Sequence, residues 1–216
     1  MLTINLSQTN SIAGVYLAAL RDISIQQDRF KFRLNLKRLG ELMAYEVSKK
    51  LDYTSAAVQT PLGNAKVNLL KEQPVVIAIM RAALPFFEGV ISVFDQADSG
   101  FVGAYRAPDF QETKSISTNY IASGNLEGKT VLLVDPMLAT GNSLLDAISK
   151  LDSLGKPEKW IILSVIAAPE GVEALNKNLP ENSALWCAAI DSGLNEKSYI
   201  VPGLGDAGDL AYGEKI

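Results

Sequence analysis

The fold of this chain is decided by Val131-Leu132-Leu133-Val134 and the nine residues behind it, Asp135-Pro136-Met137-Leu138-Ala139-Thr140-Gly141-Asn142-Ser143. An uninterrupted aliphatic run is typical of a parallel strand that is buried on both faces. The segment after it repeats apolar residues at helical spacing, at Leu144, Leu145, Ile148, Leu151 and Leu154. The nine residues are therefore predicted to form a strand-to-helix turn at the carboxyl edge of a parallel sheet, where ligands usually bind.

The residue types in this turn suit a sugar phosphate. Backbone N–H groups at the start of a helix lack partners and favour an anion, while Gly141 lets the backbone approach a ligand closely. Thr140 and Ser143 can donate hydroxyls, and Asp135 can accept the hydroxyls of a sugar. An ordinary turn with an acid and a capping serine is the simpler alternative. A nucleotide-binding P-loop is excluded, because no lysine follows Gly141.

The rest of the chain predicts an α/β fold. Helices are expected at 12–20 and in the segment that carries Phe32 to Val47 on one stripe, followed by a β-hairpin around Pro61-Leu62-Gly63-Asn64. Strands and helices then alternate, with strands at 75–80, 101–105, 131–134, 160–168 and 184–190, and helices at 84–94, 144–154 and 171–179. Such alternation predicts a mostly parallel sheet flanked by helices.

Composition bounds the class of protein. The 216 residues, 48% hydrophobic and 20% charged, predict one domain over residues 1–216. No export signal or membrane span is recognisable, so the cytoplasm is the expected location. The absence of histidine excludes imidazole catalysis, and a net charge of −4 argues against a nucleic-acid surface. Cys187, the single cysteine, lies in an apolar run and is expected to be an inert core thiol.

Four stretches give the chain a specific resemblance. VLLVDPMLATGNS at 131–143 resembles the phosphoribosyl-diphosphate signature of phosphoribosyltransferases, in the form carried by the uracil phosphoribosyltransferase family. IMRAALPFFEGV at 79–90 resembles that family's diphosphate-binding loop, and AAPEGVEAL at 167–175 its next crossover. GLNEKSYIVPGLGDAGD at 193–209 resembles its uracil-binding terminus.

The resemblance implies an enzyme that transfers phosphoribosyl from 5-phosphoribosyl 1-diphosphate to uracil, giving UMP and diphosphate. It further implies Mg²⁺ bound mainly through substrate oxygens, without a dedicated carboxylate cage. The expected partners are these small molecules, with neither nucleic acid nor membrane, and the chain is expected to form a homo-oligomer, a dimer or tetramer. The hairpin would be an arm toward a second subunit. The polar stretch between Arg106 and Leu126 would be a loop that forms a hood over the site.

By the same resemblance, the expected catalytic residues are Asp135, Arg81 and Asp206. Arg81 and Arg106 would bind diphosphate oxygens, Asp135 would hold the ribose hydroxyls, and Asp206 would touch the phosphoribosyl substrate. Backbone groups at Ile200, Gly205 and Ala207 would bind uracil. The full substrate-binding set is Arg81, Arg106, Asp135, Met137, Leu138, Ala139, Thr140, Gly141, Asn142, Ser143, Ile200, Gly205, Asp206 and Ala207.

The chain departs from the usual phosphoribosyltransferase pattern at several positions. Ala83 and Pro85 stand where glycine is usual in the diphosphate loop. Their extra bulk is expected to alter the backbone that binds diphosphate, and so to affect activity. Asn142 replaces a second glycine, and asparagine tolerates positive φ better than most residues. Pro136 and Ala139 leave the signature without a general base, as in the uracil branch. The hypothesis is that the uracil proton leaves through water, diphosphate or Asp206.

The sequence is compatible with two other functions. A regulator of the same fold would bind pyrimidine nucleotide and RNA, but it would need a basic face that the composition does not indicate. A relative acting on orotate or a purine is the second alternative. Orotate would need a cation near the C-terminal pocket, where Lys197 alone lies close in sequence.

Overall fold

A central sheet organises the computed structural model, which describes residues 1–106 and 116–214. Within this described part the strand order is β1-β10-β9-β7-β4-β5-β6, and the short strand β8 also pairs with β9. All neighbours are parallel except β5 and β6. The strands are β1 (Leu2–Asn5), β4 (Val75–Met80), β5 (Asp98–Arg106), β6 (Ile116–Ala122), β7 (Thr130–Val134), β8 (Met137–Leu138), β9 (Lys159–Ala167) and β10 (Ala184–Ile190).

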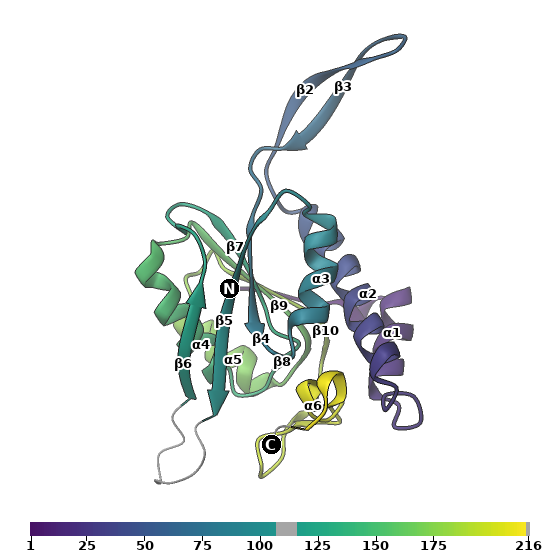
Figure 1. Ribbon diagram of the computed structural model, residues 1–216, viewed down its shortest axis with the longest axis vertical. Helices are drawn as coiled ribbons and strands as arrows, with labels where there is room; N and C mark the ends of the chain where they lie inside the picture. Colours follow the sequence, from purple (N-terminus) through teal and green to yellow (C-terminus); the bar gives the residue numbers. More distant parts are fainter. Residues whose placement is uncertain (107–115, 215–216) are drawn as a thin grey trace.

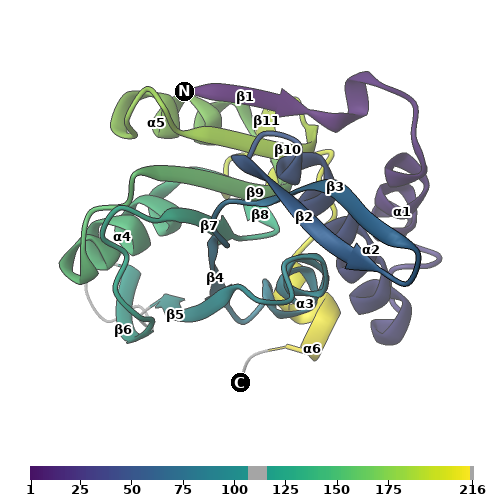
Figure 2. The ribbon, with the colours of Figure 1, turned by 90° about the horizontal axis from the view of Figure 1, so that it is seen from above.

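Helices cover both faces of the sheet (Figure 2). The first face is covered by α1 (Ile12–Arg21), α2 (Arg29–Ser48) and α3 (Leu84–Val93), and the second by α4 (Asn142–Leu151) and α5 (Pro169–Asn178). Short 3-10 turns, η1 (Leu6–Gln8) and η2 (Asp152–Leu154), follow β1 and α4. The predicted α/β architecture with a mostly parallel, helix-flanked sheet is confirmed.

The unbroken aliphatic run of strand β7 is explained by the burial of both its faces. Leu132 and Val134 pack into the core with α1, α2 and α3, whereas Val131 and Leu133 pack into the core with α4 and α5. Each of the four residues is fully buried. Because side chains alternate along a strand, a polar residue anywhere in this run would lie in one core or the other.

The chain reverses the direction of sheet growth between β4 and β7. The connection from β4 runs through α3 on one face to β5, while the connection from β7 runs through α4 on the other face to β9. The adjacent strands β4 and β7 therefore flank a topological switch point, and such a point opens a crevice at the carboxyl ends of its strands. Both the Asp135 turn and Arg81 follow these two strands directly.

The predicted hairpin is present as β2 (Tyr53–Thr60) and β3 (Gly63–Leu70), paired from Thr60–Gly63 to Tyr53–Leu70. It projects from the body of the molecule, opposite the end where the C-terminal helix α6 (Ala207–Tyr212) lies (Figure 1). Leu62, in its turn, is fully exposed. Contact of this arm with a second subunit stays a prediction.

The structure corrects the prediction of a loop throughout the polar stretch between Arg106 and Leu126. Residues 107–115 lie outside the described residues, but Ile116–Ala122 form β6, which pairs antiparallel with β5 at the sheet's edge. An edge strand has one unpaired side and accepts polar residues. The polar composition of β6 therefore led to the prediction of a loop, although its Ile and Thr residues favour strands. The helix expected at 144–154 ends at Leu151 and continues as η2.

Cys187 is buried in β10, and loss of solvent contact raises the pKa of its thiol to about 12. The prediction of an inert core thiol agrees with this position. Across the described ranges, 1–106 and 116–214, no helix is both long and apolar enough to cross a membrane.

Candidate functional site

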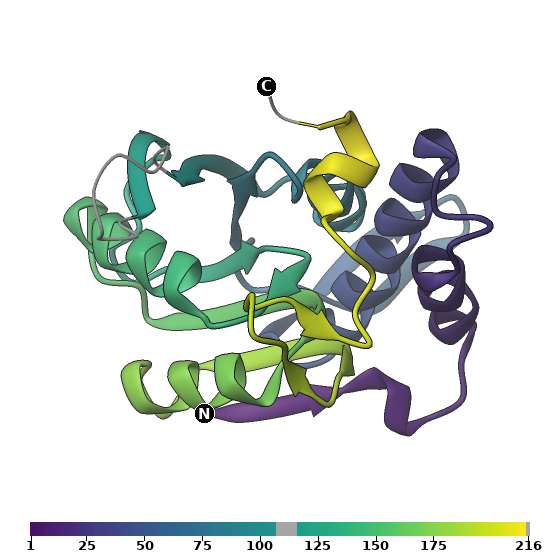
Figure 3. The same ribbon diagram turned by 90° about the horizontal axis from the view of Figure 1, so that it is seen from below.

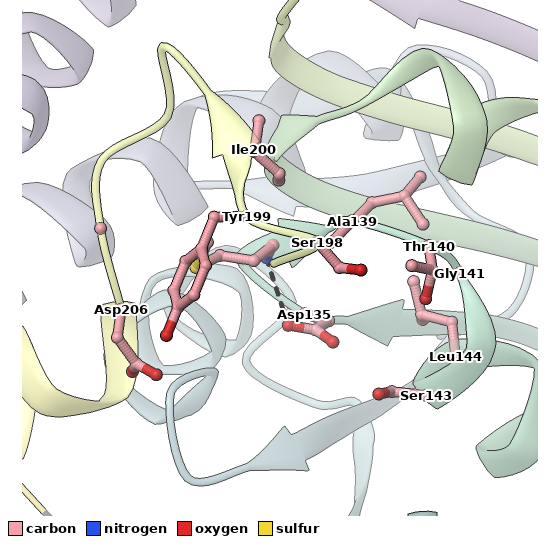
Figure 4. Close-up of a pocket in the computed structure, with 13 residues that line it drawn as sticks. Asp135, Ala139, Thr140, Gly141, Ser143, Leu144, Ser198, Tyr199, Ile200 and Asp206 are labelled. Atoms are coloured by element: carbon pink, nitrogen blue, oxygen red, sulfur yellow. Dashed lines mark hydrogen bonds between the residues drawn. The ribbon is translucent and has the colours of Figure 1, made fainter. Parts of the chain in front are cut away.

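A pocket of about 170 Å³ opens at the carboxyl end of β7. One wall is the turn that follows β7, and the opposite wall is the C-terminal segment between β11 (Gly193–Leu194) and α6, as Figure 4 shows. Its lining residues are Asp135, Met137, Leu138, Ala139, Thr140, Gly141, Ser143, Leu144, Ser198, Tyr199, Ile200, Gly205 and Asp206. Segments more than fifty residues apart in the sequence thus meet at the switch point.

Hydrogen bonds to the neighbouring strand β9 hold the turn after β7 in place. The amide of Asp135 donates to the carbonyl of Leu163 at 3.0 Å, and the carbonyl of Pro136 accepts the amides of Val165 and Ile166. Met137 and Leu138 then pair with β9 as β8. The turn is consequently part of the sheet, so its amides are positioned before any ligand arrives.

Gly141 adopts a left-handed conformation, with φ of 82°, immediately before α4. A Cβ on Gly141 would lie 3.2 Å from the Cβ of Ala174, so helix α5 packs closely behind the turn. The N-cap residue Gly141 has no side chain to cap α4, and the Oγ1 of Thr140 accepts the amide of Asn142 at the long distance of 3.4 Å. The amides that follow Asn142 in the first turn of α4 are therefore the ones available to an anion. The positive φ falls on Gly141 and not on Asn142, which begins the helix; the tolerance proposed for Asn142 is therefore not needed.

Asp135 is a partly buried acid that lacks a cationic partner in the described structure. Its Oδ1 accepts the amide of Met137 at 3.2 Å, drawn as the dashed line in Figure 4. Burial raises the pKa of the carboxyl to about 7, and the hydrogen bond from Met137 opposes this only in part. Near neutral pH the group is thus close to balance between its neutral and charged forms.

The opposite wall is built by a short strand pair and a glycine-rich segment. Strand β11 pairs antiparallel with β12 (Ile200–Val201), and the connection between them carries Ser198 at φ of 62°. The side chain of Asn195 shapes this connection by accepting the amides of Lys197 and Tyr199, each at 3.0 Å. Figure 3, viewed toward the carboxyl ends of the strands, shows the C-terminal segment continuing from β12 to α6.

Asp206 ends this segment and caps helix α6. Its Oδ1 accepts the amide of Asp209 at 3.0 Å, a typical N-cap bond. In Figure 4 the ring of Tyr199 is drawn between Asp206 and Asp135, and all three residues line the pocket. Two acids and one phenol therefore border the same space.

Most of the predicted binding residues come together here. Ten of them line the pocket: Asp135, Met137, Leu138, Ala139, Thr140, Gly141, Ser143, Ile200, Gly205 and Asp206. Asn142 and Ala207 do not line it, and Ala207 is buried as the first residue of α6. Arg106 ends β5, but its side chain lies outside the described residues.

Arg81 follows β4 at the same edge of the sheet but does not line the pocket. Its Nη2 donates to Oδ1 of Asp209 at 2.7 Å and to the carbonyl of Gly213 at 2.8 Å. Its Nε is buried without an acceptor in the described structure. In this state the guanidinium is bound to the C-terminal helix, next to the pocket.

Three lining residues were not predicted, namely Leu144, Ser198 and Tyr199. Tyr199 lies directly before Ile200, and its adjacency to a predicted base contact was the available signal. Ser198 lies within the stretch 193–209 that resembles the uracil-binding terminus, but its place in the pocket depends on a positive φ, uncommon for serine, in the turn that Asn195 closes. Among the described residues no group of three or more acids or cysteines could hold a metal ion.

Comparisons with known proteins agree on one family. The sequence model of the uracil phosphoribosyltransferase family matches residues 7–214. A protein named uracil phosphoribosyltransferase from Porphyromonas gingivalis is 43% identical over 216 residues, covering 100% of both chains. One of the same name from Pyrococcus furiosus is 40% identical, covering 93% of this chain and 85% of its own. A solved structure from Aquifex aeolicus, 33% identical, superposes with a TM-score of 0.87 over 100% of both chains.

Proposed function

This chain belongs to the uracil phosphoribosyltransferase family, and we propose that it transfers the phosphoribosyl group of 5-phosphoribosyl 1-diphosphate to uracil. The products are UMP and diphosphate. The proposal rests on one observation: the turn after β7 and the C-terminal segment before α6 face each other across one pocket. A phosphate-type turn faces a glycine-rich segment that presents backbone groups, so a ribose phosphate and a planar base can bind side by side.

The turn from Ala139 to Ser143 would bind the 5-phosphate. Its support is the left-handed Gly141, the glycine N-cap of α4 and the hydroxyls of Thr140 and Ser143. Backbone amides and a helix N-terminus favour a phosphate without requiring a lysine. Phosphate binding by backbone amides needs no excess of basic side chains, so it is compatible with the negative net charge of this chain.

Asp135 would accept the ribose hydroxyls and stabilise positive charge on the ribose as the bond to diphosphate breaks. The pKa near 7 belongs to the free protein. Cationic charge beside the carboxyl favours its ionised form, so the group is expected to be an anion in the reacting complex. Stabilising charge that develops in the transition state is where such a group contributes most to rate.

Uracil would bind against Ile200 and Gly205. Along one edge uracil presents an acceptor, a donor and an acceptor, and backbone amides and carbonyls can answer that order. Gly205, at φ of 91°, lets the backbone approach the ring closely. The amino group of cytosine would meet a donor at the same place, which predicts a preference for uracil.

Mg²⁺ is the proposed cofactor, held chiefly by substrate oxygens. The residues present fit this mode, because the pocket offers the carboxyls of Asp135 and Asp206 rather than a closed cage of acids. When bound, the ion would neutralise negative charge on the diphosphate oxygens. Arg81 would supply further positive charge to the leaving group if diphosphate draws it from Asp209.

The decisive experiment measures diphosphate release with 5-phosphoribosyl 1-diphosphate, Mg²⁺ and one base at a time, namely uracil, cytosine, orotate or hypoxanthine. Release with uracil alone supports the proposal. Release only with another base, or no release together with tight RNA binding, would refute it. Asp135→Asn should lower turnover strongly. Glu173→Gln is the matched control, since Glu173 forms an exposed ion pair with Lys177 on α5 and does not line the pocket.

A further inference from the structure

A buried ion pair outside the pocket holds the middle of the segment from Ile200 to Gly205, which is the wall expected to bind uracil. Arg21 is the last residue of α1, and Asp191 directly follows β10. The guanidinium contacts both carboxylate oxygens, with Nη1–Oδ2 at 2.9 Å and Nη2–Oδ1 at 2.6 Å. The Asp191 side chain is only 5% exposed and that of Arg21 23%. A bidentate pair of this kind is strong and fixes direction as well as distance.

Both members of the pair also bind the backbone of Gly203. The amide of Gly203 donates to Oδ2 of Asp191 at 2.9 Å, and its carbonyl accepts Nη1 of Arg21 at 3.1 Å. Within the described residues, these are the only hydrogen bonds made by the segment from Pro202 to Gly205. The ion pair therefore provides the polar contacts that hold this segment.

Gly203 lies midway between the two residues expected to contact uracil, Ile200 and Gly205. It adopts φ of 64°, and a Cβ at this position would collide with the carbonyl oxygen of Ile200. The path of the backbone from Ile200 to Gly205 thus depends on where Gly203 is held. A shift of Gly203 would change the distance between the two base contacts.

We propose that Arg21 and Asp191 are positioning residues for the nucleobase, which set the affinity for uracil without touching it. The inference rests on the proposed function and extends it to residues on α1 and after β10. The phosphate turn is anchored separately, through β8 and β9. Loosening Gly203 should consequently weaken uracil binding and leave 5-phosphoribosyl 1-diphosphate binding nearly unchanged.

The test uses the conservative variants Asp191→Asn and Arg21→Lys in the full-length protein. Each removes part of the bidentate contact while keeping a polar side chain, which lowers the risk of misfolding. We expect the KM for uracil, at saturating 5-phosphoribosyl 1-diphosphate, to rise about tenfold or more. The KM for 5-phosphoribosyl 1-diphosphate should change less than about threefold.

Leu17→Ala is the matched control, because Leu17 is buried on the same helix α1 but its aliphatic side chain can form neither a hydrogen bond nor an ion pair. It should lower the melting temperature without changing the ratio of the two KM values. Equal changes in both KM values for the pair variants, or an unchanged KM for uracil, would overturn the inference. Wild-type turnover of uracil decides the proposed function separately, and the variant-to-wild-type ratio decides the positioning role.

Discussion

The guanidinium of Arg81 lies 2.7 Å from the carboxylate of Asp209, so the cation expected to bind diphosphate is held by the C-terminal helix α6. The carbonyl of Gly213 accepts the same nitrogen at 2.8 Å. The Nε of Arg81 remains buried without an acceptor in the described structure, which leaves one donor of the guanidinium unsatisfied. Diphosphate and Asp209 are therefore expected to compete for one guanidinium.

Replacing Asp209 by asparagine should strengthen diphosphate binding. The change removes the competing charge and retains a side chain of the same shape, while Gly213 still holds Arg81. Because both partners are partly exposed, the gain is expected to be about two- to fivefold in Kd, measured by titration calorimetry with magnesium diphosphate. Glu173→Gln should leave this Kd unchanged. Weaker binding by Asp209→Asn would show that Asp209 supports the site instead of competing with it.

The raised pKa of Asp135 predicts that activity falls in mild acid. The ionised carboxyl is the form that accepts ribose hydroxyls, and its pKa in the free protein is about 7. The kcat/KM for 5-phosphoribosyl 1-diphosphate should therefore fall about tenfold per pH unit below that value. Asp135→Asn should show a lower and flatter profile between pH 5.5 and 8. A variant profile parallel to that of the wild type would assign the ionisation to another group.

The same group predicts how stability depends on pH. Because the folded-state pKa lies above the ordinary value of 3.8, ionising Asp135 opposes folding. This cost is absent below about pH 4, grows as the pH rises toward 7, and is complete above it. Asp135→Asn should thus be more stable than wild type at pH 8, by on the order of 1–3 kcal/mol. The difference in unfolding free energy, measured in urea, should shrink toward pH 4. A difference that does not vary with pH would contradict the pKa.

The sequence predicted those parts of the fold whose burial is uniform. Strand β7 and its neighbour β4 lie between two cores, so the chain shows unbroken aliphatic runs there. The turn that follows β7 was predictable too, because a left-handed Gly141 beside the start of a helix leaves a recognisable pattern. Strand β6 was not predicted, because the sequence of a polar edge strand resembles that of a loop. Strand β1 was not predicted, because four residues are too few to show a period.

The site was predictable where one residue type is required locally, and it was not where the partner is distant. Sequence placed Asp135 and the turn in the pocket, but the bond from Arg81 to Asp209 joins residues 128 positions apart. The contact of Arg21 with Asp191 spans 170 positions. Neither pair lies within a repeating pattern, so only the folded chain reveals it. Ser198 likewise lines the pocket because Asn195 closes a tight turn.

Removal of divalent cations should stop the reaction without destabilising the free protein. Since no group of three or more acids in the described residues could hold a metal ion, Mg²⁺ is expected to arrive with the substrate. Excess EDTA should abolish diphosphate release, and added Mg²⁺ should restore it. The melting temperature of the substrate-free protein should be the same with EDTA and with Mg²⁺, because an ion that does not bind the free protein cannot stabilise it. In the presence of 5-phosphoribosyl 1-diphosphate, Mg²⁺ should raise the melting temperature. A large fall in melting temperature on adding EDTA to the free protein would instead reveal a resident metal and overturn substrate-borne binding.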